Sequence, residues 1–128
     1  MKQVLSLVVF IALALSSCQS EPSGGLLDAR AFSEKSKTTK DAVILDVRTA
    51  EEFSSGYIDK AVNIDFYNPS FQSEVSKLDK SRTYFVYCEA GGRSASAAEW
   101  MRKEGFTKVF DLDGGISSWK DNKLPLVQ

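Results

Sequence analysis

The order of apolar and amphipathic segments is the feature that most limits how this chain can fold. Residues 42–47 form a nearly unbroken apolar run rich in β-branched side chains, which is typical of a strand buried on both faces. The expected strands are 42–47, 61–64, 83–87 and 108–112, and the expected helices are about 28–36, 49–56, 68–78, 94–104 and 114–119. This alternation predicts an α/β fold, a three-layer doubly wound sandwich with a mostly parallel central sheet.

Three of the expected helices begin with capping residues. Asp28 is a suitable N-cap for the first helix. Thr49 and Glu52 have the spacing of a capping box, which gives Glu52 a structural role. Asn68 and Pro69 predict the N-cap and the first residue of the third helix.

The N-terminus is expected to lie outside the folded domain. Lys2 precedes an apolar stretch over residues 4–15, which is shorter than the ~20 residues that a membrane-spanning helix needs. It fits the apolar region of a secretory signal peptide. The small polar residues that follow predict a flexible tether. We therefore expect a signal peptide at 1–17, a lipidated cysteine and tether at 18–25, and one domain at 26–128.

The run Leu15-Ser16-Ser17-Cys18 resembles the end of a bacterial lipoprotein signal. The resemblance implies cleavage before Cys18 and acylation of that residue. The protein would then be lipid-anchored in the bacterial cell envelope, on the periplasmic face of the inner or outer membrane or on the cell surface. The alternative is an ordinary signal peptide cut nearby, with Cys18 incidental.

Composition excludes several kinds of chemistry. The chain has no histidine, which removes Cys–His and Ser–His catalysis and histidine metal sites. It has two cysteines, so a lipidated Cys18 would leave Cys88 without a disulfide partner, and we expect no metal site. The net charge of −1 gives no reason to expect nucleic-acid binding.

Cys88 is the candidate catalytic residue. It follows the predicted strand 83–87 and opens a glycine-containing loop that leads into a helix. Unpaired N–H groups of such a loop, at the positive end of a helix, favour a thiolate, which is the nucleophilic form of cysteine. The alternative is that Cys88 is a small buried hydrophobic residue at the end of a strand.

Three segments in register resemble the rhodanese-like, or sulfurtransferase, domain. They are Leu45-Asp46-Val47-Arg48 with Glu52-Phe53, Gly56-Tyr57-Ile58, Ala61 and Asn63-Ile64; the Cys88-x-x-Gly91-x-Arg93-Ser94 loop; and Asp113-Gly114-Gly115-Ile116 with Trp119. The resemblance implies a cofactor-free sulfurtransferase, expected to be a monomer, in which Cys88 carries sulfur as a persulfide. The sulfur would come from thiosulfate, a persulfide or a polysulfide and would pass to cyanide, a small thiol or a protein thiol.

The resemblance also assigns roles to individual residues. Arg93 would place a cation near the substrate or pin the loop to a carboxylate such as Asp46. Asp46 and Arg48 would brace the loop, whereas Gly114-Gly115 and Trp119 would define a turn and part of the core. The expected substrate-binding loop consists of Glu89, Ala90, Gly91, Gly92, Arg93 and Ser94.

Two departures from the family pattern bear on these roles. Tyr57 stands where histidine is common, at a position expected to be structural. Glu89 stands where members that use thiosulfate often have a basic residue, so its charge should oppose a dianionic donor.

Two rival functions remain from the sequence. Phosphatases and arsenate reductases of this fold need five residues between cysteine and arginine, whereas four separate Cys88 from Arg93 here. The other rival is a non-catalytic rhodanese-like binding module at the cell envelope. Such modules typically lose the cysteine or the loop glycine, and this chain keeps both.

Overall fold

A computed structural model of the protein describes residues 24–128. The predicted signal peptide and Cys18 lie outside the described residues, so the lipid anchor stays a prediction. Within residues 24–128, no helix has the length and apolarity required to cross a bilayer.

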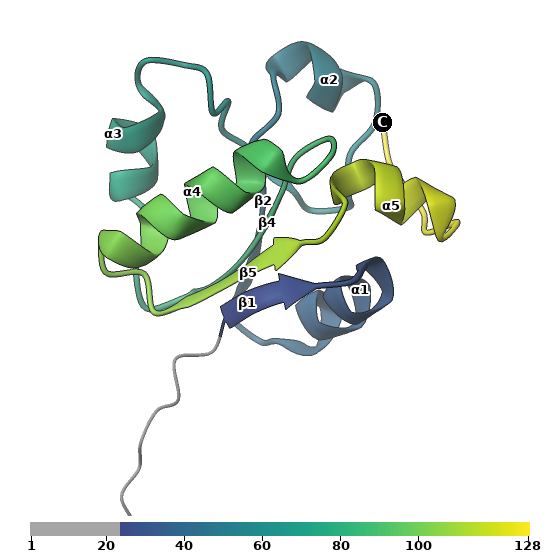
Figure 1. Cartoon of the computed structure of the whole chain (residues 1–128), viewed down its shortest axis with the longest axis horizontal. Coiled ribbons are helices and arrows are strands. Elements are labelled where there is room, and N and C mark those ends of the chain that lie inside the picture. The colour runs from purple at the N-terminus through teal and green to yellow at the C-terminus, as the bar shows by residue number, and fades with distance from the viewer. Residues whose placement is uncertain (1–23) are drawn as a thin grey trace, which may run out of the picture.

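Five parallel strands form the central sheet (Figure 1). Their spatial order is β1 (Gly24–Leu27), β5 (Lys108–Leu112), β4 (Thr83–Tyr87), β2 (Ala42–Asp46) and β3 (Val62–Asn63). Every neighbouring pair in this sheet is parallel. The carboxyl ends of all five strands therefore meet at one edge, which is where open α/β sheets place their ligand sites.

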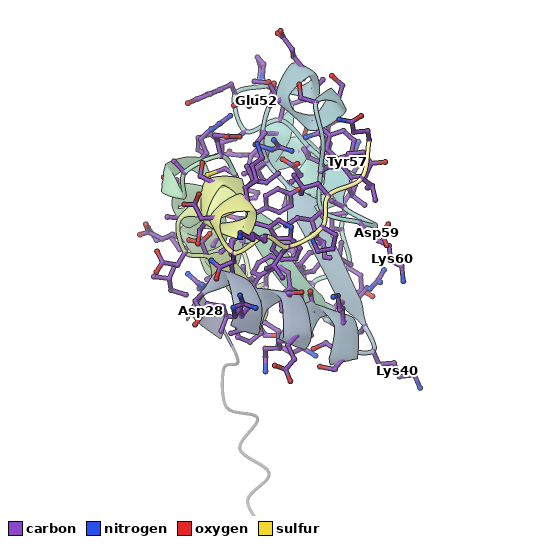
Figure 2. The ribbon with its side chains drawn as sticks, turned by 90° about the vertical axis from the view of Figure 1, so that its right-hand side faces the viewer. Asp28, Lys40, Glu52, Tyr57, Asp59 and Lys60 are labelled. Atoms are coloured by element: carbon purple, nitrogen blue, oxygen red, sulfur yellow. The ribbon has the colours of Figure 1, made fainter. Side chains whose placement is uncertain are left out.

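Helices cover both faces of the sheet and complete the three layers. Helices α3 (Phe71–Ser76) and α4 (Gly92–Lys103) pack on one face, and α1 (Ala29–Thr38) and α5 (Gly115–Asp121) pack on the other. The short helix α2 (Ala50–Ser54) buries no residue and lies beyond the end of β2 (Figure 1). Glu52 in α2 and Lys40, which precedes β2, lie at opposite ends of the molecule (Figure 2). The predicted fold class is confirmed.

The central strand β4 divides its side chains between two hydrophobic cores. Tyr84, Val86 and Cys88 belong to the core beneath α3 and α4. Phe85 and Tyr87 belong to the core beneath α1 and α5. All five residues of the strand are buried, which explains why its sequence is apolar without alternation. This packing directs the Cys88 side chain toward the face of the sheet that α3 and α4 cover.

Strand β1 was not expected from the sequence. Gly24 and Gly25, assigned above to the tether, form the first half of this strand and pair with Val109 and Phe110 of β5. A Cβ atom at Gly24 would lie 2.6 Å from the carbonyl oxygen of Val109, so the close approach of the two strands requires glycine. Glycine has low intrinsic strand propensity, and the pairing with β5 overrides it.

The start of α3 also differs from the expectation. The helix begins at Phe71, and its N-cap is Ser70 rather than Asn68. Asn68 instead accepts hydrogen bonds from the backbone N–H and the hydroxyl of Ser70 at 2.9 and 2.8 Å. This local bonding holds residues 68–70 in a turn, an alternative that Asn side chains commonly offer the backbone.

Candidate active site

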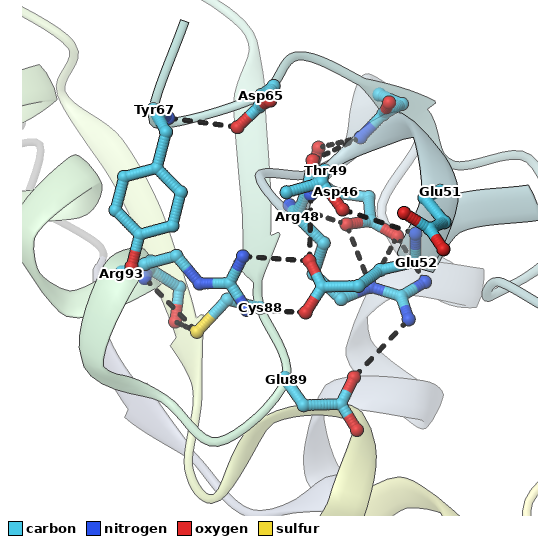
Figure 3. Close-up of polar contacts among 12 residues, drawn as sticks. Asp46, Arg48, Thr49, Glu51, Glu52, Asp65, Tyr67, Cys88, Glu89 and Arg93 are labelled. Carbon is cyan, nitrogen blue, oxygen red and sulfur yellow. Dashed lines mark hydrogen bonds and ion pairs between the residues drawn. The ribbon is translucent and has the colours of Figure 1, made fainter.

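Cys88 begins the loop that joins the end of β4 to the start of α4. Its side chain lies within the fold, with a residue exposure of 1%, and its sulfur faces inward along the loop (Figure 3). The Sγ atom accepts hydrogen bonds from the backbone N–H groups of Gly91 at 3.1 Å and Ser94 at 3.3 Å. The thiol can also donate to the Ser94 hydroxyl at 3.4 Å. Two converging N–H donors stabilise negative charge on the sulfur.

Glycine is required at the turn of this loop. Gly91 has φ of 108°, in the left-handed region that favours glycine, and it precedes the first residue of α4. This conformation turns the chain so that the N–H of Gly91 and the N–H of Ser94, in the first turn of α4, both point toward the Cys88 sulfur. The loop geometry therefore follows from the glycine that the sequence places three residues after the cysteine.

The Gly114-Gly115 turn at the start of α5 supports the cysteine loop. The backbone N–H groups of Ile116 and Ser117, in the first turn of α5, donate to the carbonyl oxygens of Cys88 at 2.9 Å and Glu89 at 3.1 Å. A Cβ atom at Gly115 would lie 2.5 Å from the Glu89 carbonyl oxygen and 2.6 Å from that of Cys88. The Gly114-Gly115 turn is thus part of the site's scaffold as well as of the fold.

Arg93 is held by Glu52. Its Nη1 and Nη2 atoms donate to the two carboxylate oxygens of Glu52 at 2.8 and 2.9 Å (Figure 3). These hydrogen bonds lower the pKa of Glu52 to about 2 and raise the pKa of Arg93. The guanidinium also lies 5.4 Å from the ring centre of Tyr67. Arg93 is therefore fixed in place before any substrate arrives.

One alternative for Arg93 was that it pins the loop to a carboxylate such as Asp46; the structure shows Glu52 in that place, so Asp46 was the wrong carboxylate. Asp46 is fully buried at the end of β2 and accepts from Arg48, at 2.7 Å from Nη2 and 2.9 Å from the backbone N–H. Glu52 also closes the capping box with Thr49 through bonds of 2.8 and 3.2 Å. In the sequence, the capping box alone accounts for a glutamate at position 52. Nothing in the sequence indicated that Glu52 also pairs with Arg93.

Arg48 links the end of β2 to the cysteine loop. Burial opposes the charge of its guanidinium, but the hydrogen bonds that Arg48 donates to Asp46, together with the attraction of neighbouring negative charge, raise the pKa of Arg48. Its Nη1 atom lies 3.4 Å from Oε2 of Glu89, and its Nη2 atom donates to the Gly56 carbonyl at 2.8 Å. The Glu89 carboxylate is turned toward Arg48 in Figure 3. The negative charge beside Cys88 is therefore partly compensated.

An open cleft of about 390 Å³ leads to Cys88. Phe66 and Tyr67 form part of its wall together with Arg93 and Ser96. Phe66 and Tyr67 were not among the predicted site residues. They follow β3 at the carboxyl edge of the sheet. This position after a strand was the one feature of the sequence that could have placed them at the site.

The described part of the chain has no candidate metal-binding site. Residues 24–128 contain no group of three metal-ligating histidine, cysteine, aspartate or glutamate side chains. The groups around the sulfur are two backbone N–H donors and one hydroxyl, and Arg93 lies in the wall of the same cleft. This arrangement can bind and stabilise an anionic sulfur species.

Fold and site together define an α/β protein with a cysteine-headed loop at the carboxyl edge of a parallel sheet. A sequence profile of the rhodanese-like domain matches residues 28–122. The chain belongs to the rhodanese-like domain family.

Relatives of similar sequence and solved structures agree with this assignment. A sulfurtransferase of Allochromatium vinosum is 30% identical over 101 residues, which cover 79% of this chain and 92% of that protein. Thiosulfate sulfurtransferase 16 of Arabidopsis thaliana, a chloroplastic protein, is 41% identical over 91 residues, covering 63% of this chain and 76% of the relative. The crystal structure of a rhodanese-related protein from Thermoplasma volcanium has a TM-score of 0.69 and 31% identity, covering 79% of this chain and 95% of that one.

Proposed function

We propose that the protein is a sulfurtransferase in which Cys88 carries sulfur as a persulfide. In the first step the Cys88 thiolate attacks the outer sulfur of a donor, the donor's S–S bond breaks, and the donor leaves as a thiolate, or as sulfite when the donor is thiosulfate. In the second step an acceptor thiolate or cyanide attacks the outer sulfur of the persulfide. The acceptor leaves with that sulfur and the Cys88 thiolate is regenerated.

The observation that carries this proposal is the pair of N–H donors on the Cys88 sulfur at the end of an open cleft. Each step begins and ends with Cys88 as an anionic thiolate or an anionic persulfide, so fixed N–H dipoles can support both steps without a proton-transferring side chain. The absence of histidine is therefore no obstacle. Arg93, held by Glu52, supplies positive charge at the wall of the cleft.

The four-residue spacing from Cys88 to Arg93 argues against phosphate-ester and arsenate chemistry. Those reactions need more amides around a tetrahedral oxyanion, whereas this smaller loop closes around a single sulfur atom. A non-catalytic binding role would leave the N–H donors at Cys88 without a purpose.

Steady-state sulfur transfer to cyanide tests the activity. Full-length protein supplied with thiosulfate or an inorganic polysulfide should produce thiocyanate, and Cys88→Ser should abolish it. A matched control is Ser73→Ala, which changes an exposed residue outside this cleft and should leave thiocyanate formation unchanged. Persistence of thiocyanate formation in the Cys88→Ser protein would refute the mechanism.

We further propose that the protein works at the cell envelope, anchored by lipid on Cys18. The support is the order of residues 2–18 in the sequence. The full-length protein should partition into membrane fractions and Cys18→Ala should lose this property. Recovery of the uncleaved, unmodified chain in the cytosol would overturn the assignment.

A further inference from the structure

A second cleft adjoins the one that leads to Cys88. It has a volume of about 270 Å³ and lies between α3 and α4. Phe66 and Ser96 line both clefts, so the two are continuous along one surface. The small inorganic donors and cyanide need only the part next to Cys88. The second cleft is therefore available to a substrate that carries its sulfur on an organic group.

The lining of the second cleft is aromatic and uncharged. Phe66, Phe71 and Trp100 form a connected group, with ring centres 5.3 Å apart for Phe66–Phe71 and 6.1 Å apart for Phe71–Trp100. Asn68 and Gln72 contribute amides, and no side chain that lines this cleft carries a formal charge. Such a surface favours an uncharged alkyl or amide-bearing group over an inorganic anion.

Two of the three polar side chains in this cleft have no partner within the described residues and are available to a ligand. Asn68 uses its carbonyl oxygen for Ser70. Within residues 24–128, the side chains of Gln72 and Ser96 have no hydrogen-bond partner. A ligand with amide groups would find donors and acceptors beside the aromatic rings, as binding sites for small organic molecules typically provide.

We propose that the second cleft binds the organic part of a neutral, amide-bearing alkyl thiol and directs its sulfur to Cys88. This inference rests on the proposed sulfurtransfer and specifies the substrate class. The thiol would act as acceptor: its thiolate attacks the outer sulfur of the Cys88 persulfide, the S–S bond to Cys88 breaks, and the thiol leaves as a persulfide. Binding of the organic group would raise the rate by holding the two sulfur atoms together.

Two acceptors of equal thiol chemistry and different length test the proposal. Pantetheine has a long chain with two amides, and N-acetylcysteamine is a short thiol with one amide. Full-length protein with persulfide on Cys88 is mixed with each acceptor, or with cyanide, and the second-order transfer rates are measured. We expect pantetheine to react at least about tenfold faster than N-acetylcysteamine, on the scale of one well-placed set of contacts.

Substitutions in α3 locate the effect. Gln72→Trp should fill the second cleft, because Gln72 lines it without lining the cleft next to Cys88. It should lower the ratio of the pantetheine rate to the cyanide rate by about tenfold. Ser73→Trp is the matched control, because Ser73 is the next residue of α3, is exposed and lines neither cleft. It should leave that ratio within about twofold of the wild-type value.

The outcomes separate this inference from the proposed function. Equal rates for the two thiols in the wild type would overturn the role of the second cleft, and so would an unchanged ratio in Gln72→Trp. In both cases transfer to cyanide would still support the sulfurtransferase. Failure of Cys88 to acquire or transfer sulfur at all would overturn the proposed function, and this inference with it.

Discussion

The ion pair between Glu52 and Arg93 gives a direct test of how the cysteine loop is held. Glu52→Gln removes the carboxylate charge, while a glutamine at this position can still complete the capping box with Thr49. The control is Glu51→Gln in the same helical turn. Glu51 carries the same charge and makes no ion pair among the described residues.

The structure sets the size of the expected effect. The pKa of Glu52 falls from 4.5 to about 2, which corresponds to at most about 3 kcal/mol of preference for the ionised form. A third of the Glu52 side chain is exposed, so solvent screening reduces the stabilisation to about 1 kcal/mol. For a domain of this size, that loss lowers Tm by about 4 °C.

The pH dependence has a definite sign. Because the pKa of Glu52 is depressed in the folded protein, the pair stabilises fully above about pH 4.5 and is lost as pH falls toward about 2. Thermal melts followed by circular dichroism at pH 7 should separate wild type from Glu52→Gln, and the two should converge near pH 2. A Tm difference that is absent at pH 7, or that equals the Glu51→Gln difference, would refute the reasoning.

Three further substitutions have expected outcomes. Asp111→Asn should raise the free energy of unfolding, measured by chemical denaturation, by about 1 kcal/mol at pH 7 and by little near pH 4. Burial raises the pKa of Asp111, and one of its oxygens lacks a hydrogen bond, so the ionised form is costly. Equal effects at both pH values would contradict this. Gly115→Ala should cost about 2 kcal/mol or more and slow sulfur transfer, because a Cβ there collides with the cysteine loop, whereas Gly92→Ala has open space and should fold normally; a normal Tm for Gly115→Ala would count against the scaffold role. Glu89→Lys should lower the KM for thiosulfate by about fivefold in low salt. The effect is smaller than for an unpaired carboxylate because Arg48 already compensates the charge of Glu89. A KM that changes with neither the substitution nor the salt concentration would show that this charge does not act on the donor.

Much of the fold could be predicted because its central strands are buried on both faces. The runs at β2, β4 and β5 are mostly apolar, and the structure places them side by side in the sheet. Strand β1 could not be predicted in this way, since half of it is glycine and its order depends on pairing with β5. Long-range pairing of this kind leaves no local periodicity in the sequence.

The candidate site shows the same contrast between features that neighbouring residues determine and features that long-range contacts determine. Cys88 and its loop were visible because strand, glycine and helix start follow one another in the chain. The partner of Arg93 was not, because Glu52 lies 41 residues away and already satisfied a local pattern. The aromatic wall at Phe66 and Tyr67 depends likewise on how the segment after β3 folds over α4, which no short motif specifies.

Intact-mass spectrometry of the full-length protein carrying Cys18→Ala, in which Cys88 is the remaining cysteine, tests the central claim most directly. After incubation with an inorganic polysulfide and removal of excess donor, the protein should carry one additional sulfur atom, and cyanide should remove it. The account predicts this gain in the Cys18→Ala protein and its absence when Cys88→Ser is added. A sulfur atom retained by the protein with both substitutions, or no gain in the Cys18→Ala protein, would contradict the assignment of Cys88 as the sulfur carrier.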